Sequence, residues 1–224
     1  MRADWLDPLV RIVASWFDDS APETQYQRFV RKSVAHLTRA VGSSTHQRVW
    51  AAEFSLALDN FQQTSFAIPN HSGGLHEGSL DLPSPQQNHD WLDAVRDGGL
   101  IVGGNIERFS AMNLLALLSQ GDQTEMQEIR PLLDVLLRHV ELRRKGSLRL
   151  RTSQRASQRW FEVHDSAILL ARSARIYTDL RYLNAALKLN DWALPVHRRS
   201  VPVDLLARYL LAVSEVQLAV EALL

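Results

Sequence analysis

The feature that most constrains the fold of this chain is the spacing of its apolar residues. Apolar side chains recur at intervals of three and four through most of the sequence, as in helices that bury one face. In the first segment, for example, Trp5, Leu9, Val13 and Trp16 fall on one such face. No segment reads convincingly as a strand. The pattern predicts an all-α protein, a multi-helix bundle of about eight or nine helices.

Capping signals and glycines divide this pattern into separate helices. Ser20 to Glu23, Ser44 to Gln47 and Thr124 to Gln127 fit the capping box that opens a helix. Pro131 is expected to kink one helix or to mark its true start. The helices predicted in this way cover residues 5–17, 20–42, 44–62, 91–95, 106–118, 124–140, 160–176, 180–192 and 202–223. Short connections in the C-terminal half predict mostly antiparallel neighbours.

Between the third and fourth predicted helices, residues 67–88 hold three prolines and three glycines among polar residues. They predict one long irregular loop, of a length that is usually functional or disordered. We expect a single all-helical domain over residues 1–224. An alternative is a three-helix subdomain in 1–66 followed by a helical subdomain in 89–224. Residues 171–192 resemble one α-hairpin of a helical-repeat or α/α-toroid protein, but no second copy follows at a fixed period, so no family is assigned.

Composition excludes several classes of protein. The chain has 224 residues, of which 46% are apolar and 22% charged, so it should bury a core. It has no cysteine, which excludes disulfides, thiolate zinc sites and cysteine nucleophiles. No 18-residue stretch is free of charge, and an acidic residue interrupts the start where a secretory signal needs an apolar run. We therefore expect no membrane partner and a cytoplasmic location.

The formal net charge of zero conceals a polarised chain. Residues 1–137 contain 10 basic and 17 acidic side chains, whereas residues 138–208 contain 15 basic and 6 acidic ones. Residues 143–159, called the arginine-rich segment below, hold seven basic side chains and no acid. Arginine binds phosphate and carboxylate bidentately, and a helix that starts near Ser153 would add its N-terminal amides. The predicted anion-binding residues are Arg149, Arg151, Arg155 and Arg159. The alternative is a solvated basic face, or one that pairs with the acidic half of the same chain.

Two histidine-containing segments are candidates for chemistry. His71, His76 and Glu77 in the predicted loop are capable of binding a metal. The two histidines lack the helical i, i+4 spacing of an HExxH site and no fourth ligand is identified, so a polar surface loop is the alternative. We predict no metal and no cofactor.

The second segment contains His164, a candidate general base, and Asp165, a carboxylate of the kind that orients such a base. Neighbouring residues on a helix point in different directions, so a residue from another helix must complete a catalytic pair. Other residues could converge on the same end of the bundle: Asp191 and Trp192 at the end of the next helix, and His197, Arg198 and Arg199 beyond it. The alternative for His164 is a partly buried histidine whose hydrogen bonds are satisfied within the fold.

The sequence has no phosphate-binding glycine loop, no nucleophile elbow and no dinucleotide fingerprint. It therefore favours a helical binding or adaptor protein whose arginine-rich face engages an anionic or protein partner, or a second copy of the chain. The first alternative is an all-α enzyme that acts on a phosphorylated or sugar-nucleotide-like small molecule. The second alternative is a nucleic-acid-binding protein.

Overall fold

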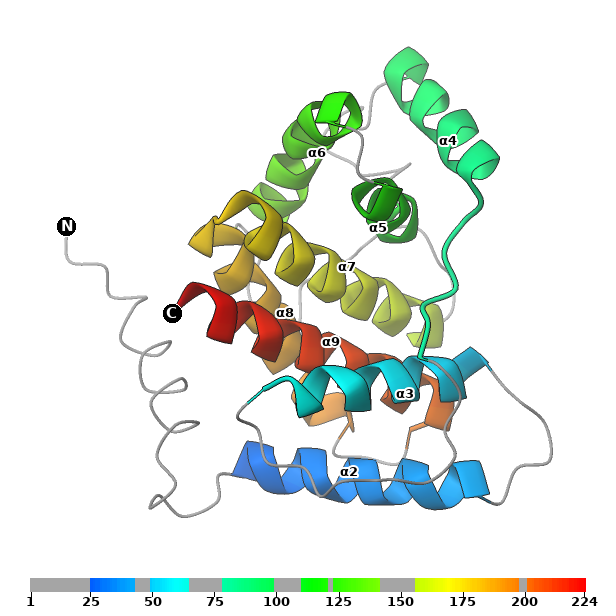
Figure 1. The fold of residues 1–224 in the computed structure, drawn as a ribbon, viewed down its shortest axis with the longest axis vertical. Coiled ribbons are helices and arrows are strands. Elements are labelled where there is room, and N and C mark those ends of the chain that lie inside the picture. Colours follow the sequence, from blue (N-terminus) through cyan, green and yellow to red (C-terminus); the bar gives the residue numbers. More distant parts are fainter. Residues whose placement is uncertain are drawn as a thin grey trace.

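The structure is a computed structural model that describes residues 25–42, 49–64, 78–98, 110–120, 123–141, 156–197 and 201–224. All regular secondary structure in these ranges is α-helical, which confirms the predicted all-α bundle (Figure 1). The helices are α2 (Gln25–Gly42), α3 (Val49–Gln62), α4 (Pro85–Gly98), α5 (Ala111–Gln120), α6 (Gln123–Glu141), α7 (Ala156–Tyr177), α8 (Leu180–His197) and α9 (Val203–Leu223).

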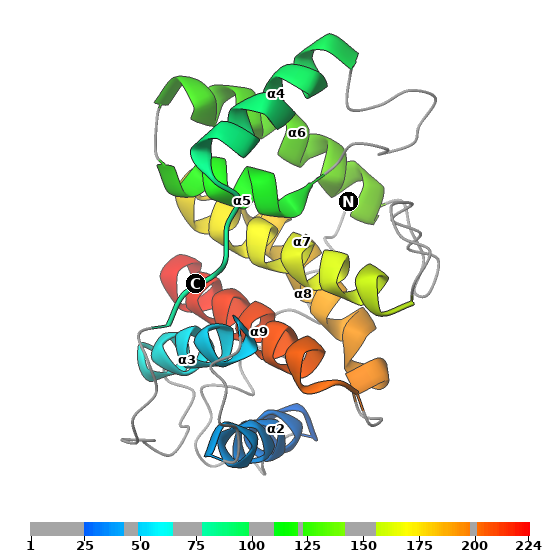
Figure 2. The same ribbon diagram turned by 90° about the vertical axis from the view of Figure 1, so that its right-hand side faces the viewer.

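Helix α9 is the central element of the bundle. Every residue from Leu205 to Gln217 is buried, because α9 packs against α2, α3, α7 and α8 (Figure 2). A helix that is apolar around most of its circumference is stable in water only when other helices enclose it. The near-continuous apolar composition of α9 therefore explains its place at the centre.

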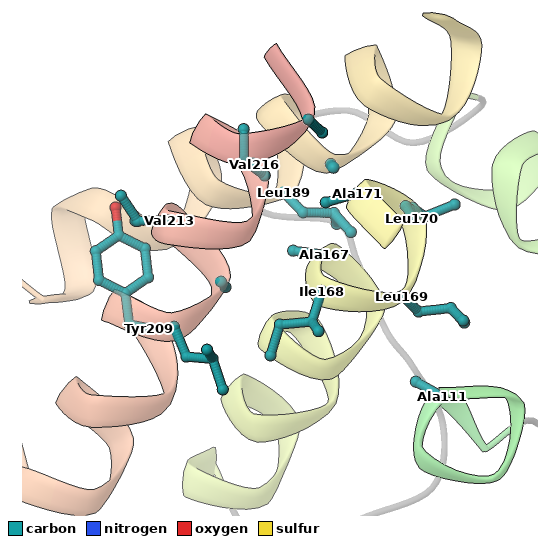
Figure 3. Close-up of a cluster of buried hydrophobic side chains, with 14 of the residues drawn as sticks. Ala111, Ala167, Ile168, Leu169, Leu170, Ala171, Leu189, Tyr209, Val213 and Val216 are labelled. Atoms are coloured by element: carbon teal, nitrogen blue, oxygen red, sulfur yellow. The ribbon is translucent and has the colours of Figure 1, made fainter. Parts of the chain in front are cut away.

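Helices α7, α8 and α9 form a closely packed trio. Only Thr178 and Asp179 separate α7 from α8, so these two helices run antiparallel. Helices α7 and α9 are parallel, because Asp165 contacts Arg208 while Arg172, further along α7, contacts Glu215, further along α9. Apolar side chains fill the interface between α7 and α9, with Ile168 of α7 lying between the two helices (Figure 3).

On the other side of α9, helix α3 also runs parallel to it. Glu53 pairs with Arg208, and Asn60 hydrogen-bonds Ser214 over 3.1 Å. Helix α2 forms the outermost layer of this side (Figure 2). The apolar faces of α2 and α3 belong to the same buried cluster as those of α7 to α9. The division into subdomains 1–66 and 89–224 stays a prediction.

The remaining helices cover the opposite face of α7. Helix α5 packs against α7, α4 packs against α5, and α6 contacts both α5 and α8 (Figure 1). Two side chains tie α6 to α8: the Tyr182 hydroxyl donates a 2.7 Å hydrogen bond to Asp134, and Lys188 Nζ donates a 2.9 Å hydrogen bond to the carbonyl of Val140. An amide pair, Asn113 and Asn88, ties α5 to α4 over 3.0 Å.

The predicted loop 67–88 differs from the structure at its C-terminal end. Residues 78–84 are irregular as expected: Gly78 and Ser79 contact α3, where the Ser79 amide donates a 3.3 Å hydrogen bond to the Ala52 carbonyl, and the chain then leads to α4. Residues 85–88 are instead the first turn of α4, so the prediction was wrong there. Ser84 and Gln87 exchange backbone and side-chain hydrogen bonds around the start of that helix, in the manner of a capping box that sequence reasoning missed. Residues 67–77 lie outside the described ranges.

The start of α6 also differs from one of the two expectations for Pro131. Helix α6 begins at Gln123 and continues through Pro131, so the proline does not mark its start. None of the helices described is long and apolar enough to cross a membrane.

Candidate functional site

The candidate histidine His164 is part of a buried imidazole pair. It lies in α7 and is 0% exposed, and its Nε2 atom is 2.9 Å from Nε2 of His197 at the end of α8. At this distance one Nε2 atom donates a proton and the other accepts it, so the two rings take opposite tautomers. The sequence indicated His197 only as one of several residues that could lie at the same end of the bundle as His164, and the structure shows that the two rings contact each other.

Aromatic rings surround this histidine pair. Tyr209 of α9 stacks on His197 with ring centroids 4.3 Å apart, and Trp160 stacks on His164 at 6.5 Å. Loss of water lowers the pKa of His197 to about 4. The pKa of His164 is lowered as well, first by burial and then by the charges of His197 and Arg208. Both rings are therefore neutral at pH 7.

The carboxylate of Asp165, the other candidate catalytic residue, pairs with Arg208 rather than with the ring of His164. The Arg208 Nη1 atom lies 2.7 Å from an Asp165 oxygen. The same guanidinium also donates two hydrogen bonds to Glu53 of α3. Arg208 Nε lies 3.0 Å from Glu53 Oε2, and Arg208 Nη2 lies 2.5 Å from Glu53 Oε1. The Met112 sulfur of α5 completes the surroundings at 3.4 Å. One arginine thus joins α3, α5, α7 and α9.

Two carboxylates share the single positive charge of Arg208, which disfavours ionising both. Burial raises the pKa of Asp165 to about 6, although the charge of Arg208 acts in the opposite direction. Burial also raises the pKa of Glu53, and the nearby Asp204 and Asp81 add to the rise. The Asp165 side chain is 14% exposed and that of Glu53 is 3% exposed. The junction therefore holds a carboxyl group that titrates near neutral pH and retains some contact with solvent.

A second ionic cluster lies seven residues further along both helices. Arg172 of α7 donates to Glu215 of α9 through Nε at 3.0 Å and Nη2 at 2.6 Å. Arg175 donates to the other oxygen of Glu215 at 2.6 Å. Here two arginines share one carboxylate, so the charge balance is the reverse of that around Arg208.

Several of these residues were missed from the sequence, above all Glu53, Arg208 and Glu215. Each is a lone charged residue inside a strongly apolar helical stretch, such as Arg208 between Ala207 and Tyr209. A charge at a position predicted to be buried requires a partner, and that rule was the signal available.

The predicted anion-binding and metal-binding residues are mostly not described. Arg149, Arg151 and Arg155 lie outside the described residues, as do His71, His76 and Glu77. Arg159 falls in the first turn of α7, but its side chain is not described. Among the side chains that are described, no group of three or more His, Asp or Glu is placed to hold a metal ion.

Comparison of the chain with models of known protein families, with curated proteins and with solved structures gave no match.

Proposed function

We propose that the chain is a helical binding or adaptor protein that engages an anionic or protein partner through its arginine-rich segment. The observation that carries the proposal is the start of α7. This helix begins at Ala156, so Arg155 directly precedes it and Arg159 falls in its first turn, which contains no acidic residue. Free amides and the helix dipole at an N-terminus favour the same anions that arginine binds.

The pairing of buried acids supports an external partner for this segment. Glu53 and Asp165 are held by Arg208, and Glu215 is held by Arg172 and Arg175. These three carboxylates in the core therefore have cationic partners that come from α7 and α9 rather than from the arginine-rich segment. This arrangement favours a role for the segment outside the core.

The test is a titration of the purified protein with labelled RNA and labelled single-stranded DNA at several salt concentrations, followed by anisotropy. We expect the logarithm of the binding constant to fall linearly with the logarithm of the salt concentration. The Arg151→Ala/Arg155→Ala double variant should lower the salt slope by about one for each phosphate that an arginine no longer binds. The matched control is Arg39→Ala/Arg138→Ala, which removes two exposed arginines from other helices.

The nucleic acids serve as polyanionic probes of the arginine-rich segment, and three results would count against the proposal. An unchanged affinity in Arg151→Ala/Arg155→Ala, or an equal loss in the control variant, would show that the segment is not the binding surface. Absence of binding to both nucleic acids at low salt would exclude a phosphate track. Failure of a following screen against acidic proteins and phosphorylated metabolites would overturn the proposal.

A second candidate function, an enzyme that acts on a phosphorylated or sugar-nucleotide-like molecule, is favoured by Asp165. Its carboxyl has a pKa of about 6, is oriented by Arg208 and is partly exposed, as a general acid or base requires. His164 is fully buried and its Nε2 atom is engaged by His197. The test is to incubate the protein with a metabolite mixture and to detect by mass spectrometry a metabolite that is depleted. Asp165→Asn should abolish the turnover of that metabolite while the fold remains intact. Unchanged turnover would discard this role.

A further inference from the structure

The cluster of Arg172, Arg175 and Glu215 presents a surplus of positive charge at the surface. Glu215 is 2% exposed and fixes both guanidinium groups, whereas the arginine side chains are 20% and 33% exposed. One carboxylate neutralises one guanidinium, so the second charge is not balanced within the cluster. Across the described part of the chain, no other acidic side chain pairs with either arginine.

The hydrogen bonds of Arg175 are also incomplete. Its Nε atom is buried and, among the described residues, has no hydrogen-bond partner. A buried donor without an acceptor costs about 1–3 kcal/mol. An incoming oxyanion beside the exposed atoms of the two guanidinium groups would supply the missing negative charge. Because Glu215 already fixes the arginine side chains, little conformational freedom is lost when such a group binds.

Exposed apolar side chains adjoin this cluster. Ile176 directly follows Arg175 and lies one turn after Arg172, and Leu180 lies four residues further along the chain. Their exposed fractions are 41% and 39%, and in the described part of the chain they are among the few large hydrophobic residues that are exposed. Positive charge beside exposed apolar surface suits a protein segment that carries acidic and apolar residues together.

We propose that Arg172, Arg175, Ile176 and Leu180 form a docking point for an acidic segment of a protein partner. A carboxylate of the partner binds the two arginines, and a neighbouring apolar side chain covers Ile176 and Leu180. This site lies at the C-terminal end of α7, whereas the arginine-rich segment leads into the N-terminal end of the same helix (Figure 1). The two proposals involve different residues and can be tested by different substitutions.

The probe is a fluorescein-labelled peptide of alternating glutamate and leucine, whose binding is followed by anisotropy. Arg172→Ala and Arg175→Ala are made singly, because each leaves one arginine on the buried Glu215 and so preserves the fold. Each should weaken binding roughly tenfold, the effect of removing one charge-assisted hydrogen bond. Ile176→Ser should weaken it as well. The control is Arg181→Ala, an exposed arginine paired with Asp179 at 2.7 Å.

Two further probes separate the parts of the proposal. A peptide with glutamine in place of glutamate should no longer pair with the arginines, and one with alanine in place of leucine should no longer cover Ile176. Binding of the glutamine peptide as tight as that of the parent would overturn the proposal. So would absence of binding by the parent peptide, or a larger loss in Arg151→Ala/Arg155→Ala than in Arg175→Ala. If single-stranded DNA, but not the peptide, depends on Arg172 and Arg175, the proposed class of partner is wrong.

Discussion

At the residue scale, Gly78 shows how closely irregular backbone approaches a helix in this fold. A Cβ atom at this position would lie 2.5 Å from the Cα atom of Leu56 and 2.9 Å from the carbonyl carbon of Ser55. Real Cβ atoms do not come so close to backbone, so the chain can approach α3 this closely only with glycine here. Gly78→Ala is expected to destabilise the protein by about 1–3 kcal/mol, as overpacking does.

Urea denaturation followed by circular dichroism measures this effect. The neighbouring substitution Ser79→Ala is the control, because the Ser79 side chain is exposed and its backbone amide bond to Ala52 is retained. Equal stability of Gly78→Ala and Ser79→Ala would contradict the close approach.

A second backbone position, Thr178, carries strain that a substitution can relieve. It has a φ of 52°, in the left-handed region, at the end of α7. The Asp179 amide bonds the Ala174 carbonyl over 3.1 Å, as in a Schellman motif. This conformation costs a side-chain-bearing residue about 1–2 kcal/mol. Thr178→Gly should therefore raise the unfolding free energy by about 0.5–1 kcal/mol. Thr178→Ala retains the Cβ atom and should change it much less; an equal gain from both variants would exclude this origin.

At the element scale, the two ionic clusters fix the register of α7 against α9. Asp165 faces Arg208, and seven residues later Arg172 faces Glu215, so the order of charges is reversed between the two levels. A slip of seven residues, about 10 Å along a helix, would set Asp165 against Glu215 or Arg172 against Arg208. Apolar contacts alone discriminate weakly between such registers, whereas buried like charges are strongly unfavourable.

Substitution of Arg208 is expected to reduce the unfolding free energy strongly. Arg208→Ala would leave Glu53 and Asp165 buried without a cation and is expected to cost about 3–5 kcal/mol in unfolding free energy. Replacing the two acids as well, in Glu53→Gln/Asp165→Asn/Arg208→Met, should recover most of that loss. Arg181→Ala, whose side chain is 57% exposed, should cost at most about 1 kcal/mol. Similar losses in Arg208→Ala and Arg181→Ala, measured by urea denaturation, would contradict the account.

The positions of the helices along the chain could be predicted from the sequence, but which helices pack against each other could not. Periodicity and capping are local, so helices such as α7 and α9 were found with nearly their observed bounds. Parallel packing of α3 and α7 on α9 depends on contacts between distant residues, such as Glu53 with Arg208, which are separated by 155 positions. Apolar spacing carries no information about which helix covers which. His164 and Asp165 were candidate residues from the sequence, but the residues that contact them, His197 and Arg208, lie in α8 and α9.

At the scale of the whole molecule, two titrating clusters in the core oppose each other as pH falls. The pKa of each buried histidine is lower in the folded protein than its usual value of 6.5. Unfolded chains therefore bind more protons than folded ones below pH 6.5, and stability is lost between that pH and about 4. The pKa of Asp165 is raised from 3.8 to about 6, so its effect is a gain in stability as pH falls through 6.

Glu53, whose pKa is also raised, acts in the same direction as Asp165. The two histidines of the unfolded chain take up protons from about pH 6.5, above the pKa of Asp165, and we therefore expect the unfolding free energy to fall as pH is lowered from about 7 to about 5. Asp165→Asn removes the opposing gain and should enlarge this fall by about 1 kcal/mol, since one proton corresponds to about 1.4 kcal/mol per pH unit. His197→Phe removes one of the two histidines that protonate on unfolding, so it should make the fall smaller. Urea denaturation at each pH provides the measurement.

The control for this pH dependence is Asp179→Asn. Hydrogen bonds from Arg181 lower the pKa of Asp179, so this group stays ionised throughout the range and its removal should shift stability equally at both pH values. If Asp165→Asn behaves in the same way as Asp179→Asn, the Asp165 carboxyl does not titrate near pH 6. Its sharing of Arg208 with Glu53 would then be an ordinary ion pair, and the case for Asp165 as a proton-transfer group would end with it.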